Sequence, residues 1–171
     1  MKNIVLFGFM GTGKTTVGKI LSKKLNLPLL DMDSIISEEE EKTINSIFAE
    51  SGEKYFRDLE NKLTHRLSKY SGKIISTGGG IVLNEENINL YKNNGLLVCL
   101  EASPEKIVER LKNDKSRPLL EFENNEKEAE IKCLLQNRKS LYDKIDFKIK
   151  TDLKHPELVA NEIINKYNED S

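Results

Sequence analysis

The chain of 171 residues has few cysteines and no long apolar segment. Its two cysteines, Cys99 and Cys133, lack the spacing of metal-binding or redox motifs. Both lie in apolar stretches, so we expect buried free thiols, which suit a reducing compartment. No apolar run approaches the length of a membrane span, and the apolar start is too short for a signal peptide. These absences predict a protein of the cytoplasm.

An excess of charge of one sign is also lacking. The chain has 27 Lys and Arg residues against 28 Asp and Glu residues, which gives a net charge of −1. Without a basic field, we do not expect recruitment to nucleic acid or to an acidic membrane surface. The length and the 37% of hydrophobic residues fit a single domain over residues 1–171. No strong apolar seam indicates a partner subunit, so we expect a monomer.

The chain does contain a glycine-rich motif near its start. The apolar run Asn3–Phe7 leads into the pattern G-x-x-x-x-G-K-[ST], with Gly8, Gly13, Lys14 and Thr15 at the fixed positions. In such a P-loop, backbone N–H groups cradle phosphates, the lysine reaches the β- and γ-phosphates, and the threonine hydroxyl ligates Mg²⁺. We therefore predict a site for ATP with Mg²⁺. The residues expected to bind the nucleotide are Gly11, Thr12, Gly13, Lys14, Thr15 and Thr16.

Apolar runs alternate with segments of helical spacing along the chain. This alternation predicts the P-loop NTPase fold, a three-layer α/β/α sandwich with a five-stranded parallel sheet and ligands at the carboxyl ends of the strands. The expected strands are Asn3–Phe7, Leu29–Met32, Lys73–Thr77, Leu96–Glu101 and Asp146–Lys150. The expected helices are 14–26, 34–70, 84–94, 104–112, 126–142 and 156–168. Asn84 is expected to cap the helix over 84–94, and Gly95 to end it in the left-handed conformation.

Two stretches interrupt this alternation. The helical insert at 34–70 is where we expect a substrate-binding subdomain, over about residues 32–61. The polar stretch that follows residue 112 carries Arg117, and there we expect a mobile lid over about residues 112–125. An arginine in a lid can neutralise the charge that develops during phosphoryl transfer, although it can also be a solvated loop residue.

The second expected strand ends in two acidic residues, in the order Asp31-Met32-Asp33. Because side chains alternate along a strand, we expect both carboxylates to project to the side on which the P-loop opens. One could orient Mg²⁺ through a water molecule, and the other could hold or deprotonate an acceptor hydroxyl. The plain alternative is that one of them caps the following helix.

A further group of residues suits an acceptor that carries a carboxylate. Arg57 and Glu60 are neighbours on a helix face, either as a surface ion pair or as a fixed guanidinium that can grip a carboxylate with two hydrogen bonds. The run Gly78–Gly80 after the third strand predicts a loop whose backbone approaches a ligand closely. Arg138 could be a second carboxylate grip, while Tyr142 could simply pack.

In their order and spacing these motifs resemble shikimate kinase. The matching segments cover about the whole chain: Gly8–Thr15, Asp31–Asp33, Phe56–Glu60, Gly78–Gly80, Arg117–Leu120 and Arg138–Tyr142. A P-loop alone is shared with many unrelated enzymes, whereas the acidic pair, Phe-Arg-x-x-Glu and three glycines together are far more specific. The resemblance implies transfer of the γ-phosphoryl group of ATP to the 3-hydroxyl of shikimate, in the biosynthesis of chorismate and aromatic amino acids.

The resemblance also implies roles for individual residues. Lys14 and Arg117 would stabilise the transferring phosphoryl group, and Asp33 would hold shikimate hydroxyls and help to take the proton. Asp31 would act on Mg²⁺ through water, and Arg110 would lie against the adenine, although it could be an exposed helix residue. The acceptor site would involve Phe48, Phe56, Arg57, Glu60, Gly79, Gly80 and Arg138.

Three other functions share some of these features. A sugar-acid kinase of the gluconate type has a P-loop and an acceptor with a carboxylate and hydroxyls, but Phe56–Glu60 and Gly78–Gly80 argue against it. A nucleoside-monophosphate kinase needs a base-reading pocket in the insert, where Arg57 suits a carboxylate but could also grip a phosphate. A module that only binds nucleotide has no need of Lys14 and Arg117 together with the acidic pair.

Overall fold

Strand β1 (Asn3–Phe7) is buried along its whole length. Its side chains alternate between two apolar cores, with Ile4 and Leu6 in one and Val5 and Phe7 in the other. A strand that buries both of its faces requires helices on both sides of the sheet. The chain therefore forms the three layers expected from its sequence.

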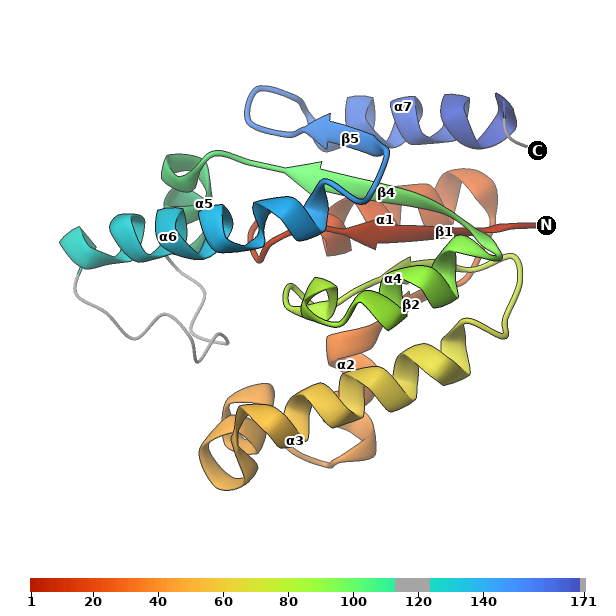
Figure 1. Ribbon diagram of the computed structural model, residues 1–171. Coiled ribbons are helices and arrows are strands. Elements are labelled where there is room, and N and C mark those ends of the chain that lie inside the picture. Colours follow the sequence, from red (N-terminus) through yellow and green to blue (C-terminus); the bar gives the residue numbers. More distant parts are fainter. Residues whose placement is uncertain (113–123, 170–171) are drawn as a thin grey trace.

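All pairings in the sheet are parallel, and the strand order is β2-β3-β1-β4-β5 (Figure 1). The other strands are β2 (Leu29–Asp31), β3 (Ile74–Ser76), β4 (Gly95–Glu101) and β5 (Phe147–Lys150). The five expected strands are thus confirmed to within one residue at each end. The strands point the same way, so the segments that follow them meet at one edge of the sheet.

Helices cover both faces of this sheet. They are α1 (Lys14–Leu25), α2 (Met32–Glu39), α3 (Ile44–Leu67), α4 (Glu85–Lys92), α5 (Pro104–Leu111), α6 (Asn124–Tyr142) and α7 (Pro156–Glu169), with a 3₁₀ turn η1 (Ile81–Leu83). Helices α1 and α7 pack on one face, where Leu21 and Ile163 share a core with Leu6. Helices α3, α4 and α6 cover the other face, where Tyr91 and Tyr142 join the core around Phe7.

This computed structural model describes residues 1–112 and 124–169, and at residues 124–127 only the backbone. Arg117 and most of the predicted lid lie outside the described residues. Within the described part of the chain, no helix combines the length and the apolar character that crossing a membrane requires. Helix α2 and the start of α3 lie beyond the edge strand β2 (Figure 1). The assignment of 32–61 as a substrate-binding subdomain stays a prediction.

The expected single helix at 34–70 is wrong in detail, because the insert is built from α2 and α3. The turn between them contains Glu41 in the left-handed conformation, with φ of 52°. Thr43 then caps α3, since its side chain accepts a hydrogen bond from the Ser46 N–H at 3.1 Å. Within α3, Gly52 has φ of 80° and ψ of 171°, which bends the helix near its middle.

Two smaller expectations are also wrong. Gly95 does not end α4 in the left-handed conformation, since it is the first residue of β4. A Cβ atom there would lie 3.1 Å from a Val5 methyl group and 3.2 Å from the Tyr91 carbonyl, so close packing accounts for the glycine. Cys99 is a buried free thiol as expected, but Cys133 lies on the exposed side of α6. The cap at Asn84 is confirmed by its hydrogen bond from the Glu86 N–H at 3.0 Å.

Candidate active site

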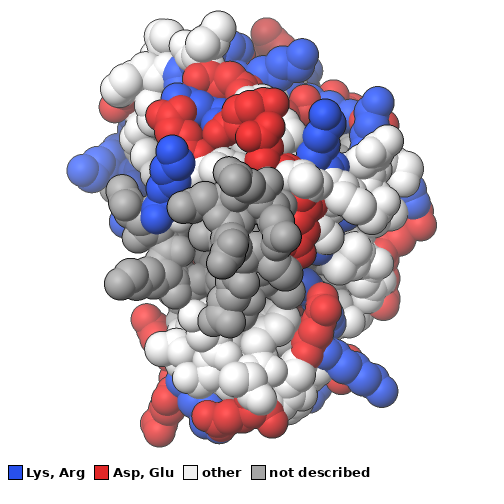
Figure 2. Space-filling view, turned by 90° about the vertical axis from the view of Figure 1, so that its left-hand side faces the viewer, with Lys and Arg blue, Asp and Glu red and all other residues white. Residues whose placement is uncertain are grey.

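A cavity of about 420 Å³ opens beside the P-loop at the carboxyl ends of the strands. All six residues predicted to bind the nucleotide line it: Gly11, Thr12, Gly13, Lys14, Thr15 and Thr16. Asp31, Asp33 and Arg110 line the same cavity. Figure 2 shows the side of the molecule at which the strands end, where basic and acidic side chains are interspersed. Recognition of an anion here must therefore come from the groups inside the cavity.

Lys14 is held inside the loop that precedes it. Its side chain is buried, and Nζ donates to the carbonyl oxygen of Gly8 at 2.8 Å and to that of Phe9 at 3.0 Å. The same Phe9 oxygen accepts from the Thr12 hydroxyl at 2.7 Å. A buried ammonium group in a loop of backbone donors is a strong local source of positive potential.

The acidic pair is brought to the cavity, although not for the reason expected. Only Asp31 belongs to β2, whereas Asp33 lies in the first turn of α2, so strand alternation does not place both carboxylates. Asp31 accepts from the Thr15 hydroxyl at 2.8 Å and also from the Ser34 N–H at 3.2 Å, which caps α2. Asp31 therefore caps α2 as the plain alternative expected. It also lies beside the P-loop threonine, a position compatible with the predicted role toward Mg²⁺.

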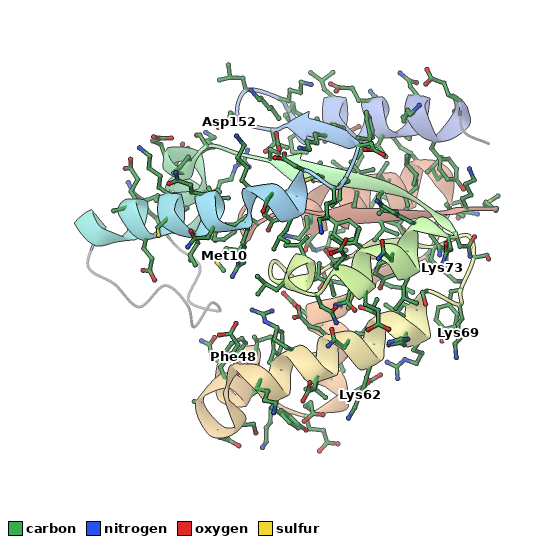
Figure 3. All side chains as sticks on the ribbon, in the orientation of Figure 1. Met10, Phe48, Lys62, Lys69, Lys73 and Asp152 are labelled. Carbon is green, nitrogen blue, oxygen red and sulfur yellow. The ribbon has the colours of Figure 1, made fainter. Side chains whose placement is uncertain are left out.

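A second, narrow pocket adjoins the first. Its lining residues come from the P-loop region, α2, α3, the glycine loop and α6: Met10, Asp33, Ile44, Phe48, Phe56, Arg57, Glu60, Gly79, Gly80 and Arg138. Figure 3 shows Met10 and Phe48 facing one another across the space between α6 and the start of α3. Asp33 lines both pockets and therefore marks their junction.

Arg57 is fixed from both sides by carboxylates on its own helix. Its Nη1 donates to Glu60 at 2.6 Å, while Nη2 donates to Glu53 at 3.0 Å. The guanidinium also lies 5.4 Å from the centre of the Phe56 ring. The prediction that Glu60 holds the Arg57 guanidinium is thus confirmed, whereas Glu53 was missed even though it lies four residues before Arg57 on a helix.

Glu60 is an unusual carboxyl group because its side chain is only 1% exposed. Burial raises its pKa to about 7, against the opposing effect of Arg57 and with a further rise from the charge of Asp33. Burial lowers the pKa of Arg57, but Glu60 and Glu53 outweigh it and raise that pKa. Within the described part of the chain, Glu60 Oε1 has no hydrogen-bond partner. The pair is therefore a permanently charged arginine beside a carboxyl group that titrates near neutral pH.

Two of the three glycines fit around this pair. A Cβ atom at Gly78 would lie 2.2 Å from Glu60 Oε1, and one at Gly80 would lie 2.3 Å from Arg57 Nη1. Real Cβ atoms do not approach other atoms that closely, so only glycine leaves room for the ion pair in this position. The loop was predicted to approach a ligand; the structure shows that it approaches Arg57 and Glu60.

Helix α6 contributes the other arginine of the pocket. Arg138 is 6% exposed and donates from Nη1 to the Gly79 carbonyl oxygen at 3.2 Å. Tyr142 donates to the same oxygen at 3.0 Å, and burial raises the pKa of this phenol, so it stays a donor at ordinary pH. Tyr142 therefore does more than pack, since it ties α6 to the glycine loop. The Arg138 guanidinium also lies 5.5 Å from the centre of the Phe9 ring.

Arg110 lines the nucleotide cavity but is bound to the protein. It donates from Nη1 to the Gly11 carbonyl oxygen and to the Thr151 hydroxyl, each at 3.0 Å, and from Nη2 to the Thr151 carbonyl oxygen at 2.9 Å. It is therefore not a free surface arginine, and its contact with adenine stays a prediction. The contacts of Thr151 were not predicted, because a single threonine after a strand has no distinguishing pattern.

Comparison with known proteins agrees with this geometry. A family model described as shikimate kinase matches residues 10–168. The shikimate kinase of Caldicellulosiruptor saccharolyticus is 50% identical over 165 residues, which cover 96% of this chain and 95% of the relative. That of Thermodesulfovibrio yellowstonii is 47% identical over 167 residues, which cover 98% of this chain and 95% of the relative.

Solved structures give the same result. A shikimate kinase from Acinetobacter baumannii in complex with shikimate superposes with a TM-score of 0.93 at 33% identity, over 100% of this chain and 95% of that one. A sugar kinase from Janibacter has a TM-score of 0.62 at 16% identity over 98% and 95% of the two chains, which shows a shared fold alone. On the family model and these relatives together, the chain belongs to the shikimate kinase family.

Proposed function

We propose that the two adjoining pockets hold ATP and shikimate, and that the protein transfers the γ-phosphoryl group of ATP to the 3-hydroxyl of shikimate. The observation that carries this proposal is the position of Asp33, which lines both pockets. A carboxylate at their junction can hold the acceptor hydroxyl in line with the phosphoryl group and accept its proton. The relatives named shikimate kinase and the shikimate-bound neighbour support the identity of the acceptor.

On the nucleotide side, Lys14 and the backbone of the P-loop bind the phosphates and stabilise charge on the transferring group. Thr15 and Asp31 suit Mg²⁺, because this ion prefers hard oxygen ligands. The Thr15 hydroxyl and a carboxylate oxygen of Asp31 both lie in the cavity, 2.8 Å from each other. Thr15 would hold the ion directly and Asp31 through water. Bound Mg²⁺ would neutralise phosphate charge. Arg117, outside the described residues, and Arg110 stay proposed partners of the nucleotide.

On the acceptor side, Arg57 and Arg138 supply two guanidinium groups on one narrow pocket, which suits the single carboxylate of shikimate. Glu60 and Glu53 orient Arg57, so little side-chain entropy remains to be lost when the substrate binds. Phe48 lies against Phe56, with ring centres 4.7 Å apart, as an apolar wall for the ring of the substrate. The backbone of Gly79 and Gly80 completes the pocket.

The acceptor pocket distinguishes the proposed function from the two other kinase functions. A gluconate-type kinase also phosphorylates a hydroxy acid, but the pocket here is narrow and has an aromatic wall. A nucleoside-monophosphate kinase would need room for a base beside Arg57, where Phe48 and Phe56 line the narrow pocket. A coupled assay of ADP release with shikimate, gluconate and AMP distinguishes these functions directly. Rapid turnover of gluconate or AMP, with none of shikimate, would reject the proposal.

The role of Arg57 is tested by Arg57→Ala. We expect the KM for shikimate to rise by about 10–100-fold, because charged hydrogen bonds contribute on the order of 1.5–3 kcal/mol, while the Kd for ATP stays within about twofold. Arg66→Ala is the matched control, because Arg66 lies on the same helix but its side chain is 48% exposed. A variant that lost ATP binding while keeping its shikimate KM would contradict the assignment.

We also propose that the protein works as a monomer in the cytoplasm. The two free thiols, Cys99 and Cys133, support a reducing compartment. The nearly balanced charge supports the absence of a nucleic-acid partner. Light scattering coupled to size exclusion, with and without ATP and shikimate, tests the monomer. A stable dimer under both conditions would contradict it.

A further inference from the structure

A single buried threonine after β5 contacts the P-loop from a distance of 139 residues along the chain. Thr151 is 3% exposed, and its hydroxyl lies 3.2 Å from the carbonyl oxygen of Thr12 and 3.1 Å from that of Glu101. A hydroxyl has one proton, so it is shared between these two acceptors. Its lone pair accepts from Arg110 Nη1 at 3.0 Å. The proton and one of the two lone pairs of this hydroxyl are thus used within the protein.

Arg110 closes a ring of contacts around the same loop. It donates to the carbonyl oxygens of Gly11 and of Thr151, and to the Thr151 hydroxyl. Two consecutive P-loop carbonyls, at Gly11 and Thr12, are therefore held by one arginine and one threonine from other parts of the chain. The Thr151 N–H donates to Glu101 at 2.8 Å, which fixes Thr151 itself to the end of β4.

The direction of these carbonyl groups matters for phosphate binding. In a trans peptide unit the C=O and the N–H point in opposite directions. Holding the Thr12 carbonyl therefore fixes the direction of the Gly13 N–H, which belongs to the same peptide unit and to the phosphate-binding loop. A loop whose donors are already oriented loses little entropy when the nucleotide binds.

From this arrangement we propose that Thr151 is a positioning residue for nucleotide binding and phosphoryl transfer, which acts through its hydroxyl on the Thr12 peptide and on Arg110. The inference rests on the proposed function where it is tested by turnover of shikimate. Measurement of ATP binding in the absence of shikimate tests it independently. Thr151 need not touch the reacting atoms. Loss of its hydroxyl should weaken the binding of ATP and leave that of shikimate unchanged. The described contacts of this hydroxyl are with Thr12, Glu101 and Arg110, on the nucleotide side.

The test replaces Thr151 with valine, which keeps the branched shape and removes the hydroxyl. We expect the Kd for ATP, measured by calorimetry without shikimate, to rise about tenfold, since one or two lost hydrogen bonds of ordinary strength amount to that factor. In the coupled assay, the KM for ATP should rise and kcat should fall, while the KM for shikimate stays within about twofold. Thr151→Ser retains the hydroxyl and should restore ATP binding to within about twofold of the native Kd.

Thr64→Val is the matched control, because Thr64 is also fully buried and its hydroxyl donates to a backbone carbonyl, that of Glu60, at 2.9 Å. It should lower the melting temperature without changing the Kd for ATP. If Thr151→Val behaves like this control, or if serine fails to restore ATP binding, the positioning role is wrong. If the valine variant does not fold, Thr151→Ala is measured in its place. A native protein that binds ATP but leaves shikimate unchanged would overturn the proposed function and not this inference.

Discussion

The nucleotide pocket and the acceptor pocket lie side by side but are assembled differently. Six nucleotide-pocket residues come from one continuous stretch, Gly11–Thr16. The acceptor pocket takes its arginines from α3 and α6, its carboxyl groups from α2 and α3, and its backbone from the glycine loop. The phosphate-binding part of the first pocket is therefore a local motif, although Asp31, Arg110 and Thr151 join it from distant segments. The second pocket has no such continuous stretch and depends wholly on the packing of distant segments.

This difference changes what a glycine means in each pocket. P-loop glycines at Gly11 and Gly13 have positive φ, so their backbone conformation is the reason for the residue type. Gly80 has φ of −102°, which any residue adopts, and the obstacle to a side chain there is the Arg57 guanidinium. Side chains from other elements thus fix the acceptor loop, and its sequence cannot be understood without them.

The largest expected effect is that of Lys14→Ala on the nucleotide side. Loss of the buried ammonium removes charge stabilisation of the transferring phosphoryl group, so kcat should fall by about 10²–10³-fold or more. The exposed Lys19 on the same helix gives the control, since Lys19→Ala should leave kcat within about twofold. Steady-state assays with both substrates measure this. Near-native kcat in Lys14→Ala would show that the P-loop lysine is dispensable.

A smaller effect, confined to the acceptor side, is expected of Gly80→Ala. The new methyl group would lie 2.3 Å from Arg57 Nη1, so the guanidinium must leave the position in which it bonds Glu60. We expect the KM for shikimate to rise about 10–50-fold with little change in the Kd for ATP.

A double-mutant cycle sharpens this prediction. If Gly80→Ala acts through Arg57, it should add little in the Arg57→Ala background, because the side chain that it displaces is already gone. Additive effects of the two substitutions on the KM for shikimate would show that the methyl group acts on the substrate directly.

Glu60 allows the acceptor pocket to be tested through stability. Its pKa is about 7 in the folded protein, above the ordinary value of 4.5, so between these pH values the folded state binds more protons than the unfolded state. The contribution of Glu60 to the free energy of unfolding should therefore fall as pH rises from about 4.5 to 7 and stay constant above that range. Relative to Glu60→Gln, the native protein should lose on the order of 1–3 kcal/mol across this range.

Urea unfolding at several pH values measures this difference. Glu53→Gln is the control, because Glu53 pairs with the same arginine but its side chain is 52% exposed, so water screens its charge. A difference between native and Glu60→Gln protein that stayed flat from pH 4.5 to 7 would mean that the buried carboxyl group does not take up a proton in the folded state.

The same contrast explains how much the sequence could predict. The strands and the cap at Asn84 depend on local patterns, and the structure confirms them. The P-loop is also a local pattern, and its residues line the nucleotide cavity. The reason given for Asp33 was wrong, because β2 ends one residue earlier than expected and α2 begins at once. The contacts of Thr151 could not be predicted, since its partners are defined only by tertiary packing.

The smallest expected effect concerns the apolar wall of the acceptor pocket. Phe48 is partly buried against Phe56, and removing one ring of such a pair costs about 0.5–1.5 kcal/mol beyond the lost area. Phe48→Ala should therefore raise the KM for shikimate about 2–12-fold and leave the KM for ATP unchanged. Phe147→Ala removes a partly buried ring from the core between the sheet and α7, so it should lower stability without altering either KM. If Phe48→Ala instead raised the KM for ATP and the KM for shikimate equally, Phe48 would form a wall of both pockets. The two pockets would then not bind their substrates independently, although they are assembled from different segments.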